Sequence, residues 1–403
     1  MPNLDRCLNI GDLRAAARRR LPKGVFEFVD RATEDHIAVA NNRGAFQRIK
    51  LRHRALVDVS KRSVATNLFG KPVSLPMAIA PTGAAGLCWH EGELELAKAA
   101  AKAKIPLTLS TASMTAMEKI AQHGGPDKGG RLWFQLYVWK QRELSHQLIE
   151  RANRNGFEAL IVTVDSPVSP NREYNTHNGF GLPFTPTPRF VLDVMRHPTW
   201  ARDVLLKYYT TTGMPRHENY PPEYQQSILS GVGSRDAMRA DSLDWNDIAR
   251  FRDIWPGILM IKGVNRPDDA VKAIEYGLDG IVVSNHGGRN MDSSAAPIDL
   301  LAEIAEAVNN RATVILDSGI RRGSDIAKAL ALGAKAVLTG RATLYGTAAG
   351  GEAGALRAIS LIRNELDKTM AYTGCCTVDE LSPDIFFGYR RGNRLSGMSA
   401  AAA

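Results

Sequence analysis

Cysteine is scarce in this sequence, because its 403 residues include only four, at positions 7, 88, 375 and 376. None of them has the spacing of a zinc site, since the adjacent pair at 375 and 376 has no second pair to complete a set of ligands. The sequence therefore predicts no bound metal. So few cysteines also fit a reducing compartment.

Long apolar segments are absent as well. The N-terminus reaches several arginines before any apolar stretch long enough for a signal peptide. The longest run without a charged residue, 72–90, has prolines at 72, 76 and 81 and several small polar residues, which argues against a membrane span. We therefore expect a cytoplasmic protein.

The basic residues do not form a nucleic-acid site. The net charge is +9, but the cationic residues are scattered, and they lack the interleaved aromatic residues of a single-strand binder. We therefore expect no nucleic-acid partner. Attraction to anionic substrates or to lipid headgroups is the simpler account of the charge.

What the sequence does contain is a regular alternation of short apolar runs and helical patterns. Most of the runs are followed by a segment in which apolar residues recur three and four positions apart and Gly ends the pattern. Apolar strands that alternate with helices are typical of parallel strands buried on both faces. Eight such units predict a (β/α)8 TIM barrel. The eight runs are 75–81, 105–111, 132–138, 159–165, 258–263, 280–285, 313–319 and 336–341.

Two segments do not follow this alternation. Residues 1–70 have helical patterns at 12–21 and 34–47, and they predict an N-terminal helical extension that caps the bottom or the side of the barrel. Residues 166–240 are rich in Pro, Tyr and Gly and are too long for an ordinary loop after strand four. This long loop would be a lid, a partner surface or a membrane patch. The chain, 1–403, is expected to be a single domain with the barrel over 75–375.

Polar residues gather where the predicted strands end. In a TIM barrel the chemistry lies at the carboxyl ends of the strands, because the loops converge there over a packed interior. The motif "SNHGGR" puts His286 and Arg289 just past strand six, with two glycines between them. A lone histidine is more often structural than a base, but this position favours a base. The neighbours expected at this end are Thr82, Gly83, Ser110, Gln135, Tyr137, Thr163, Asp165, Lys262, Asp317, Gly340 and Arg341.

The loops after strands seven and eight carry glycines and arginines, in "DSGIRRGSD" and "LTGRATLYG". These loops are the usual phosphate site of this barrel, where backbone N–H groups and a helix N-terminus meet the anion. Ser324 is the expected N-cap of the helix after strand seven. The sequence therefore predicts a ligand that carries a phosphate, although charge alone does not identify it.

In this order the motifs resemble those of the FMN-dependent L-2-hydroxy acid oxidases and dehydrogenases. The resemblance runs from about residue 21 to about residue 382, through "LPKGVFEFV", "APTG", "LSTAS", "WFQLYV", "TVDSP", "IKGV", "SNHGGR", "DSGIRRGSDIAKALALGA" and "TGRATLYG". The last two motifs and the length of the loop after strand four are most similar to the (S)-mandelate dehydrogenase branch. The resemblance implies FMN as the cofactor and oxidation of an (S)-2-hydroxy acid to the 2-oxo acid.

Carried over residue by residue, the resemblance implies roles for five side chains. His286 would be the base that takes a substrate proton. Asp165 would pair with the imidazolium and raise its pKa, because an opposite charge favours the protonated form. Arg289 and Arg172 would clamp the substrate carboxylate, a task that suits a planar guanidinium. Tyr137 would hydrogen-bond the substrate oxygen.

The same resemblance implies the flavin contacts. Lys262 would lie near the N1 and C2 carbonyl of the ring, where its charge stabilises the anionic reduced flavin. The other expected contacts are Thr82, Gly83, Ser110, Gln135, Thr163 and Ser284 for the ring edge, Asp317 for the ribityl chain, and Arg321, Gly340 and Arg341 for the phosphate.

One position departs from the family pattern. The family usually has Tyr-Asp-Tyr in the segment that here reads "VFEFVD", and its second tyrosine commonly touches the substrate carboxylate, whereas this chain has Phe28. Either a larger or less polar substrate occupies that side, or the two arginines suffice for the carboxylate. The change argues against glycolate and lactate, and it leaves mandelate-like acids or an uncharged 2-hydroxy lactone open.

The electron acceptor is predicted from Gly83 and from the long loop. Many family members with Ala at this position are oxidases, whereas Gly occurs in the mandelate dehydrogenase branch, so Gly83 favours a quinone or other carrier over O2. Residues 189–209 mix aromatic and aliphatic residues with Arg and Lys, a composition that suits the membrane interface. We expect peripheral contact with the inner face of the cell membrane as an alternative to a self-packed lid. The family habit implies a homo-tetramer.

Several alternatives stay open. The protein could be a hydroxy acid oxidase that makes hydrogen peroxide, a 2-hydroxy lactone dehydrogenase, or another FMN barrel, such as a type 2 isopentenyl diphosphate isomerase or a dihydroorotate dehydrogenase-like enzyme. Another FMN barrel should lack "SNHGGR" together with Tyr137 and Arg172. A barrel that binds flavin without turnover would tolerate loss of the base, yet His286, Asp165 and Lys262 are all present.

Overall fold

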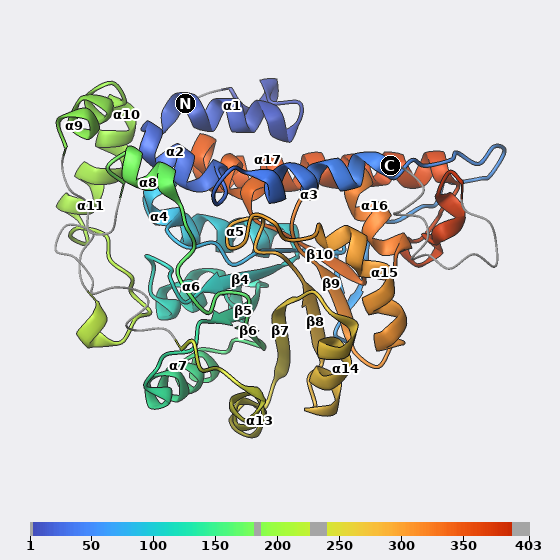
Figure 1. The fold of residues 1–403 in the computed structure, drawn as a ribbon. Helices are drawn as coiled ribbons and strands as arrows, with labels where there is room; N and C mark the ends of the chain where they lie inside the picture. The colour runs from blue at the N-terminus through green and yellow to red at the C-terminus, as the bar shows by residue number, and fades with distance from the viewer. Residues whose placement is uncertain (1–2, 181–186, 226–239, 389–403) are drawn as a thin grey trace.

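The structure, a computed structural model, describes residues 3–180, 187–225 and 240–388. Eight parallel strands form a closed barrel in the order β10-β3-β4-β5-β6-β7-β8-β9, which confirms the predicted (β/α)8 TIM barrel (Figure 1). Each strand coincides with one of the eight apolar runs, although β5 begins one residue before its run and β7 ends one residue after its run. The strands are β3 (Met77–Ile79), β4 (Pro106–Ser110), β5 (Arg131–Leu136), β6 (Ala159–Thr163), β7 (Ile258–Val264), β8 (Gly280–Val283), β9 (Thr313–Leu316) and β10 (Ala336–Thr339).

The apolar runs form strands because both of their faces are buried. Side chains such as Trp133, Ile161 and Met260 point inward and fill the barrel as one apolar cluster. The alternate side chains pack outward against the surrounding helices in a second cluster. Since side chains fill the interior, a ligand site can form only where the loops meet at an end of the barrel.

Helices follow the strands as the periodicity predicts. They are α4 (Ala85–Cys88) and α5 (Gly92–Ala103) after β3, α6 (Met117–Gly124) after β4, α7 (Arg142–Arg154) after β5, α13 (Trp245–Ile254) after β6, α14 (Pro267–Glu275) after β7, α15 (Pro297–Val308) after β8, α16 (Gly323–Ala331) after β9 and α17 (Arg341–Thr373) after β10. Short 3-10 turns lie at η1 (Leu4–Arg6), η2 (Pro126–Lys128), η5 (Val378–Glu380) and η6 (Pro383–Ile385).

The start of α16 differs from the prediction, which made Ser324 the N-cap. The helix begins at Gly323, and the carboxylate of Asp325 accepts the backbone N–H groups of Arg321 at 2.9 Å and Arg322 at 3.0 Å. The Ser324 prediction is wrong because the helix begins one residue earlier, so Ser324 lies inside its first turn, and the N–H of Gly323 is bound by the Glu365 carboxylate at 2.9 Å.

The N-terminal helices lie at the side and at the carboxyl end of the barrel. α1 (Ile10–Arg20) packs along α17, whereas α2 (Lys23–Asp30) and α3 (Ile37–Arg48) continue toward the loops that follow the strands (Figure 1). A Cβ atom on Gly288 would lie 2.7 Å from the backbone nitrogen of Val39. α1 therefore lies against an outer helix of the barrel, and α3 contacts the loop after β8.

A hairpin rather than a helix closes the bottom. β1 (Thr66–Leu68) pairs with β2 (Lys71–Val73), and the Phe69 ring between them meets Trp133 edge-on, with 6.0 Å between ring centroids. Leu68 and Val73 join the apolar cluster inside the barrel. Strands of three residues are too short for an alternation to show in the sequence, so helical patterning alone missed this element.

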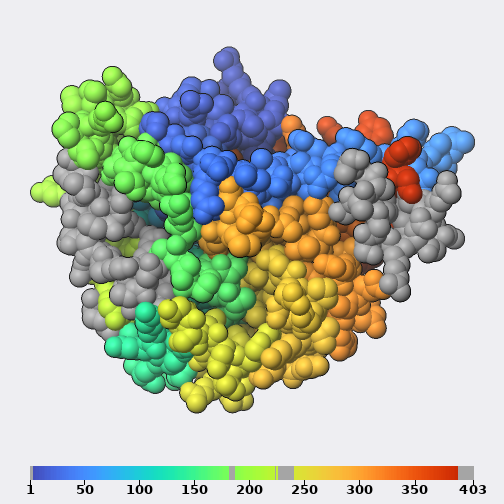
Figure 2. Space-filling model, viewed as in Figure 1, coloured from blue at the N-terminus to red at the C-terminus, as the bar shows by residue number. Residues whose placement is uncertain are grey.

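The described parts of the long loop are largely helical. They contain α8 (Glu173–His177), α9 (Pro188–Met195), α10 (Pro198–Trp200), the π-helical turn η3 (Ala201–Leu206), α11 (Lys207–Thr210) and η4 (Pro222–Tyr224), while 181–186 and 226–239 of the predicted loop lie outside the described residues. Trp200 Nε1 donates to Leu87 O at 2.7 Å, and Tyr208 Oη accepts from the Glu91 N–H at 3.0 Å. These bonds fix residues 198–210 to α4 and α5. In Figure 2 the yellow-green part of this loop projects beside the blue N-terminal helices.

Candidate active site

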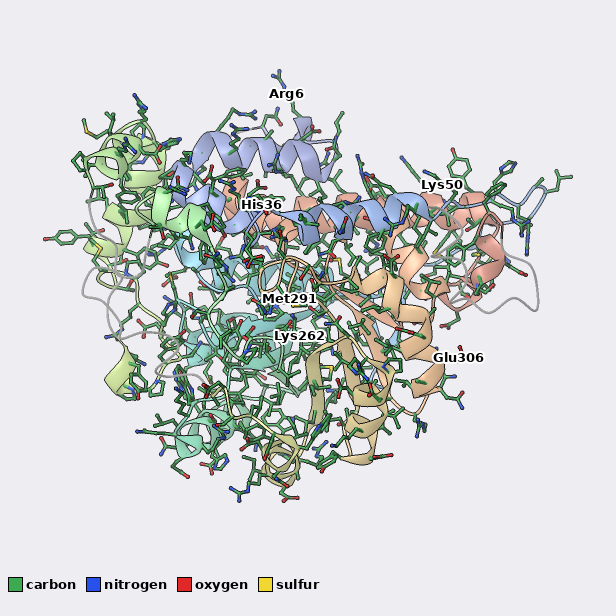
Figure 3. The ribbon with its side chains drawn as sticks, in the orientation of Figure 1. Arg6, His36, Lys50, Lys262, Met291 and Glu306 are labelled. Carbon is green, nitrogen blue, oxygen red and sulfur yellow. The ribbon has the colours of Figure 1, made fainter. Side chains whose placement is uncertain are left out.

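A cavity at the carboxyl end of the barrel brings most of the predicted site residues together. Those that line it are Phe28, Thr82, Gly83, Ser110, Tyr137, Arg172, Lys262, His286, Arg289, Asp317, Arg321, Gly340 and Arg341. The other four lie behind this wall: Gln135, Asp165 and Ser284 are bonded to residues that form it, and Thr163 is bonded to Gln135. Figure 3 shows Lys262 near the centre of the barrel, whereas Arg6, Lys50 and Glu306 lie at the periphery.

His286 is held between a carboxylate and a phenol. Its Nδ1 lies 2.9 Å from Asp165 Oδ1, and its Nε2 lies 3.2 Å from Tyr137 Oη. A carboxylate only accepts, so Nδ1 carries the proton in the neutral ring and Nε2 has the lone pair that a base needs. Nε2 is therefore the atom that can take a proton in the cavity.

Burial controls the pKa of this histidine. It lowers the pKa of His286, and the opposing attraction of Asp165 does not offset it, so the pKa lies below its ordinary value. Asp165 raises the pKa of His286, as predicted, but burial is the larger effect. Burial also opposes ionisation of Asp165, yet the charges of His286 and Lys262 hold the pKa of that carboxyl below its ordinary value. Asp165 is thus a carboxylate beside a neutral base.

Lys262 is a buried ammonium group on β7. Its Nζ lies 3.0 Å from Ser284 Oγ and 3.1 Å from Asp317 Oδ2, and its side chain is 3% exposed. Burial lowers the pKa of Lys262, but the carboxylates of Asp317 and Asp165 outweigh it and raise the pKa. The cavity therefore keeps a fixed positive charge at its inner wall.

The two arginines of the expected carboxylate clamp lie close together. Arg289 Nη1 donates to the backbone oxygens of Phe28 at 2.8 Å and Arg31 at 2.9 Å, and Arg172 Nη2 donates to Arg289 O at 3.3 Å. The Phe28 ring packs against Phe180, with 5.3 Å between ring centroids. The clamp thus has an aromatic wall on the side where the family tyrosine is missing.

A second cationic region suits a phosphate. Arg341, the first residue of α17, donates to the backbone oxygens of Val29 at 3.0 Å and Gly287 at 2.8 Å. Burial and the nearby charges of Arg289 and Arg321 lower the pKa of Arg341 to about 10. No described side chain caps the N-terminus of α17. Clustered buried cations beside free helix N–H groups are stabilised by an anion, so this region fits the FMN phosphate.

The inner wall fits the ring of FMN. Ser110 Oγ donates to Gln135 Oε1 at 3.0 Å, and Gln135 Nε2 donates to Thr163 Oγ1 at 2.9 Å, so a polar chain runs behind this wall. Small residues form part of the wall, since a Cβ atom on Gly83 would lie 3.2 Å from Ala112 Cβ. A flat ring can approach backbone at such a wall. The cationic region and the polar chain together match the phosphate and the ring edge of FMN.

Among the residues that line the cavity and that sequence reasoning missed are the polar residues Ser166, His217, Asn290 and Ser318. Asn290 Nδ2 donates to Asp165 O at 2.7 Å and to Ser166 Oγ at 2.8 Å. Ser318 Oγ accepts the N–H of Gly287 at 2.9 Å. His217, from the long loop, lies 3.1 Å from Ala112 O. The sequence signals were that Ser166 and Ser318 lie within the motifs "TVDSP" and "DSGIRRGSD" and that Asn290 directly follows "SNHGGR".

Comparisons with known proteins agree on one family. A profile described as FMN-dependent dehydrogenase matches residues 17–387. The chain is 40% identical over 376 residues to the (S)-mandelate dehydrogenase of Pseudomonas putida, covering 93% of both chains. It is 40% identical over 375 residues to the L-lactate oxidase of a Nostoc species, covering 93% of this chain and 96% of the relative. A crystal structure of the monotopic membrane protein (S)-mandelate dehydrogenase matches with a TM-score of 0.87 and 39% identity, covering 95% of this chain and 99% of the other.

Proposed function

The chain belongs to the FMN-dependent dehydrogenase family, and we propose that it oxidises an (S)-2-hydroxy acid with an aromatic side chain to the 2-oxo acid. One observation carries the proposal. A histidine whose unprotonated Nε2 faces the cavity beside Tyr137, and whose Nδ1 is paired with a buried carboxylate, lies in the same cavity as two arginines that can hold a carboxylate. These are the groups needed to fix a 2-hydroxy acid and remove a proton from it.

Each of these side chains has a separate role in the proposed reaction. Arg289 and Arg172 bind the substrate carboxylate and orient the α-carbon. His286 takes the substrate proton at Nε2, and Asp165 stabilises the imidazolium that results. Tyr137 hydrogen-bonds the substrate oxygen. When bound, FMN supplies the two-electron acceptor for the oxidation.

Other residues would hold the cofactor. Lys262 places its ammonium group at the polar edge of the ring, where it stabilises negative charge. Thr82, Gly83 and Ser110 would contact that edge from the cavity wall, with Gln135, Thr163 and Ser284 behind them. Asp317 would bind the ribityl chain, and Arg321, Gly340 and Arg341 the phosphate.

An aromatic substrate is supported by the shape of the cavity wall. Phe28 offers a ring where the family has a tyrosine hydroxyl, and the small residues Gly83 and Ala112 line the same cavity. Apolar rings bind a phenyl group better than a methyl group, because more apolar surface leaves water. The similarity to (S)-mandelate dehydrogenase points the same way.

The acceptor proposed is a quinone or another electron carrier, on the basis of Gly83. An oxidase is the second candidate, because a relative of equal identity is named L-lactate oxidase. Specificity constants for (S)-mandelate, (R)-mandelate, L-lactate and pantoyl lactone, each with an artificial dye and with O2, test both points. We expect the highest value for (S)-mandelate with the dye. A highest value for lactate or for the lactone would contradict the proposed substrate.

We further propose that the long loop binds the surface of an anionic membrane. Exposed apolar side chains occur on α9 and in η3 and α11: Val191, Leu192, Met195, Leu206 and Tyr209. Cationic residues line a pocket beside them: Arg19, Arg20, Arg202 and Lys207. Apolar side chains that insert beside cations are typical of interfacial helices. The similar solved structure is described as monotopic, and no helix among the described residues is long and apolar enough to cross a bilayer.

Sedimentation with vesicles tests this surface. We expect binding to phosphatidylglycerol vesicles, and weaker binding when Leu192 and Met195 are both replaced by Ser. The control is Ile254→Ser, at the end of α13, which is exposed but far from α9 in Figure 1. Equal binding of the two variants would contradict this membrane surface.

The expected homo-tetramer has one candidate contact surface. Exposed apolar side chains gather at Leu56, Val57, Tyr372 and Phe387, which the hydrogen bonds from Arg54 N to Tyr372 O and from Phe387 N to Lys50 O bring together. We propose that copies of the chain meet there. Light scattering should report a tetramer for the parent and a smaller species for Leu56→Asp, whereas a monomeric parent would contradict the proposal.

A further inference from the structure

A chain of hydrogen bonds leads from Asn290 to the base. Asn290 Nδ2 donates to Ser166 Oγ at 2.8 Å, Ser166 Oγ donates to Asp165 Oδ1 at 3.1 Å, and Asp165 Oδ1 lies 2.9 Å from His286 Nδ1. Both Ser166 and Asn290 line the cavity and are half-buried. The family resemblance assigned a role to neither residue.

The chain has a fixed direction. The amide of Asn290 must present its nitrogen, because the backbone oxygen of Asp165, 2.7 Å away, can only accept. Its two N–H groups are then used on Asp165 O and Ser166 Oγ. Ser166 Oγ accepts one of them, so its own proton is directed to Asp165 Oδ1.

The hydrogen bonds from Ser166 and from His286 both end on the same carboxylate oxygen of Asp165. Asp165 Oδ1 accepts from both Ser166 and His286, whereas Oδ2 is buried without a hydrogen-bond partner among the described residues. A second donor on Oδ1 spreads the negative charge that would otherwise stabilise the imidazolium of His286.

We propose that Ser166 and Asn290 are positioning residues that make His286 a weaker and better oriented base, because Ser166, held by Asn290, donates a second hydrogen bond to Asp165 Oδ1. The inference rests on the proposed function, because it takes His286 as the base. The other titratable or charged groups that face the pair are Tyr137 after β5, Arg172 at the start of α8 and Lys262 on β7. None of these groups changes in the variants below.

The test is the pH dependence of kcat/KM for the holoenzyme. A histidine base must be neutral, so kcat/KM falls as the pH drops through the His286 pKa. This fall is the acidic limb of the profile. Removing the Ser166 hydroxyl leaves Asp165 more basic, so Ser166→Ala should shift the acidic limb to higher pH by about half a pH unit to one pH unit. Asn290→Ala should move it in the same direction, because the hydroxyl can then rotate away. Ser166→Thr keeps the hydroxyl, so its acidic limb of kcat/KM should lie at the same pH as that of the parent.

The double variant and a structural control separate this role from simple loosening of the site. If both residues act through one hydrogen bond, Ser166→Ala with Asn290→Ala should shift the limb no further than Ser166→Ala alone. Ser318→Ala removes a bond to the same loop at Gly287 but has no link to Asp165, so it should leave the limb in place. The inference would be overturned if the pH shifts of the two single variants add in the double variant. It would also be overturned if the acidic limb of kcat/KM in Ser166→Ala lies at the same pH as in the parent.

A binding measurement gives a second readout. Phenylacetate has the carboxylate but not the reacting hydroxyl, and it should bind more tightly when His286 is protonated. Its dissociation constant, measured by calorimetry against pH, should show the same upward shift in Ser166→Ala, and no shift would count against the inference. If the parent oxidises none of the hydroxy acids, the proposed function is contradicted. If the parent is active but the pH dependence of the variants equals that of the parent, only this inference is contradicted.

Discussion

The Phe28 ring lies beneath the guanidinium of Arg289, whose central carbon is 5.2 Å from the ring centroid, and the same guanidinium donates to the Phe28 backbone oxygen at 2.8 Å. An arginine over an aromatic ring contributes about 0.5 to 1 kcal/mol at exposed sites. Phe28 therefore holds the clamp arginine through its ring and its backbone, while it offers the substrate no hydroxyl.

Phe28→Tyr should shift the enzyme toward small substrates. The added hydroxyl can donate to the substrate carboxylate, and a hydrogen bond to a charged group contributes about 1.5 to 3 kcal/mol. We expect the ratio of kcat/KM for L-lactate to that for (S)-mandelate to rise about tenfold. An unchanged ratio would mean that this side of the cavity does not select the substrate.

His286→Asn should remove most of the activity without loss of the cofactor. A general base contributes a factor of about 10² to 10⁴, so kcat should fall within that range. The flavin content of the purified variant, read from its absorbance, is the control. A fall of less than tenfold with full flavin content would assign the base to another residue.

The acidic limb of the parent enzyme should lie below the ordinary histidine value of 6.5, because burial lowers the pKa of His286. The neutral base is then present at all higher pH values. Lys262 keeps its charge over the same range, since its pKa is raised above 10.5. A profile of kcat/KM from pH 5 to 9 checks this, and a limb above 6.5 would show that Asp165 outweighs burial after all.

The barrel could be predicted from the sequence because its signals are local. Each strand is an apolar run, and most of the runs are followed by a helical period, so the eight units could be counted without knowing any contact. The site residues at the ends of β5, β6, β7 and β8 followed from the same count, since the carboxyl ends of parallel strands meet at one face.

The features that could not be predicted from the sequence depend on contacts between distant segments. The contact of Asn290 with Ser166 joins two loops, and His217 reaches the cavity from the long loop, so neither is marked by periodicity. The net pKa of His286 also needs the structure, because burial cannot be read from the residue type alone. The Ser324 cap was wrong because α16 begins before it, where the N–H of Gly323 is bound by Glu365 on α17, a contact between distant residues.

Arg321→Met should weaken the binding of FMN but not that of riboflavin. Loss of one charged partner of a phosphate costs about 1.5 to 3 kcal/mol, which is roughly a ten- to hundredfold rise in Kd. Riboflavin lacks the phosphate, so its Kd is the control, and both values follow from flavin fluorescence with the apoenzyme. Equal losses for the two flavins would place the phosphate elsewhere.

Because the pKa of Arg341 is about 10, the FMN affinity of the apoenzyme should also fall as the pH rises through that value.

Tyr208→Phe should loosen residues 198–210 from the barrel. Tyr208 is buried, and its oxygen accepts the Glu91 N–H at 3.0 Å, so the change leaves that donor unpaired. We expect the free energy of unfolding to fall by about 1 to 2 kcal/mol, with faster proteolysis within this segment. Tyr209→Phe is the matched control, because Tyr209 is 71% exposed and should change neither property. Equal stability of the two variants would contradict this anchoring.

The most direct test is to mix the FMN-loaded protein with (S)-mandelate in the absence of air, follow the flavin absorbance, and then admit air. We predict rapid bleaching that persists in air, since the site should accept the hydroxy acid and pass its electrons to a carrier rather than to O2. Rapid return of the colour would make the protein an oxidase. A flavin that (S)-mandelate does not bleach at all would contradict the assignment of an aromatic 2-hydroxy acid to this cavity.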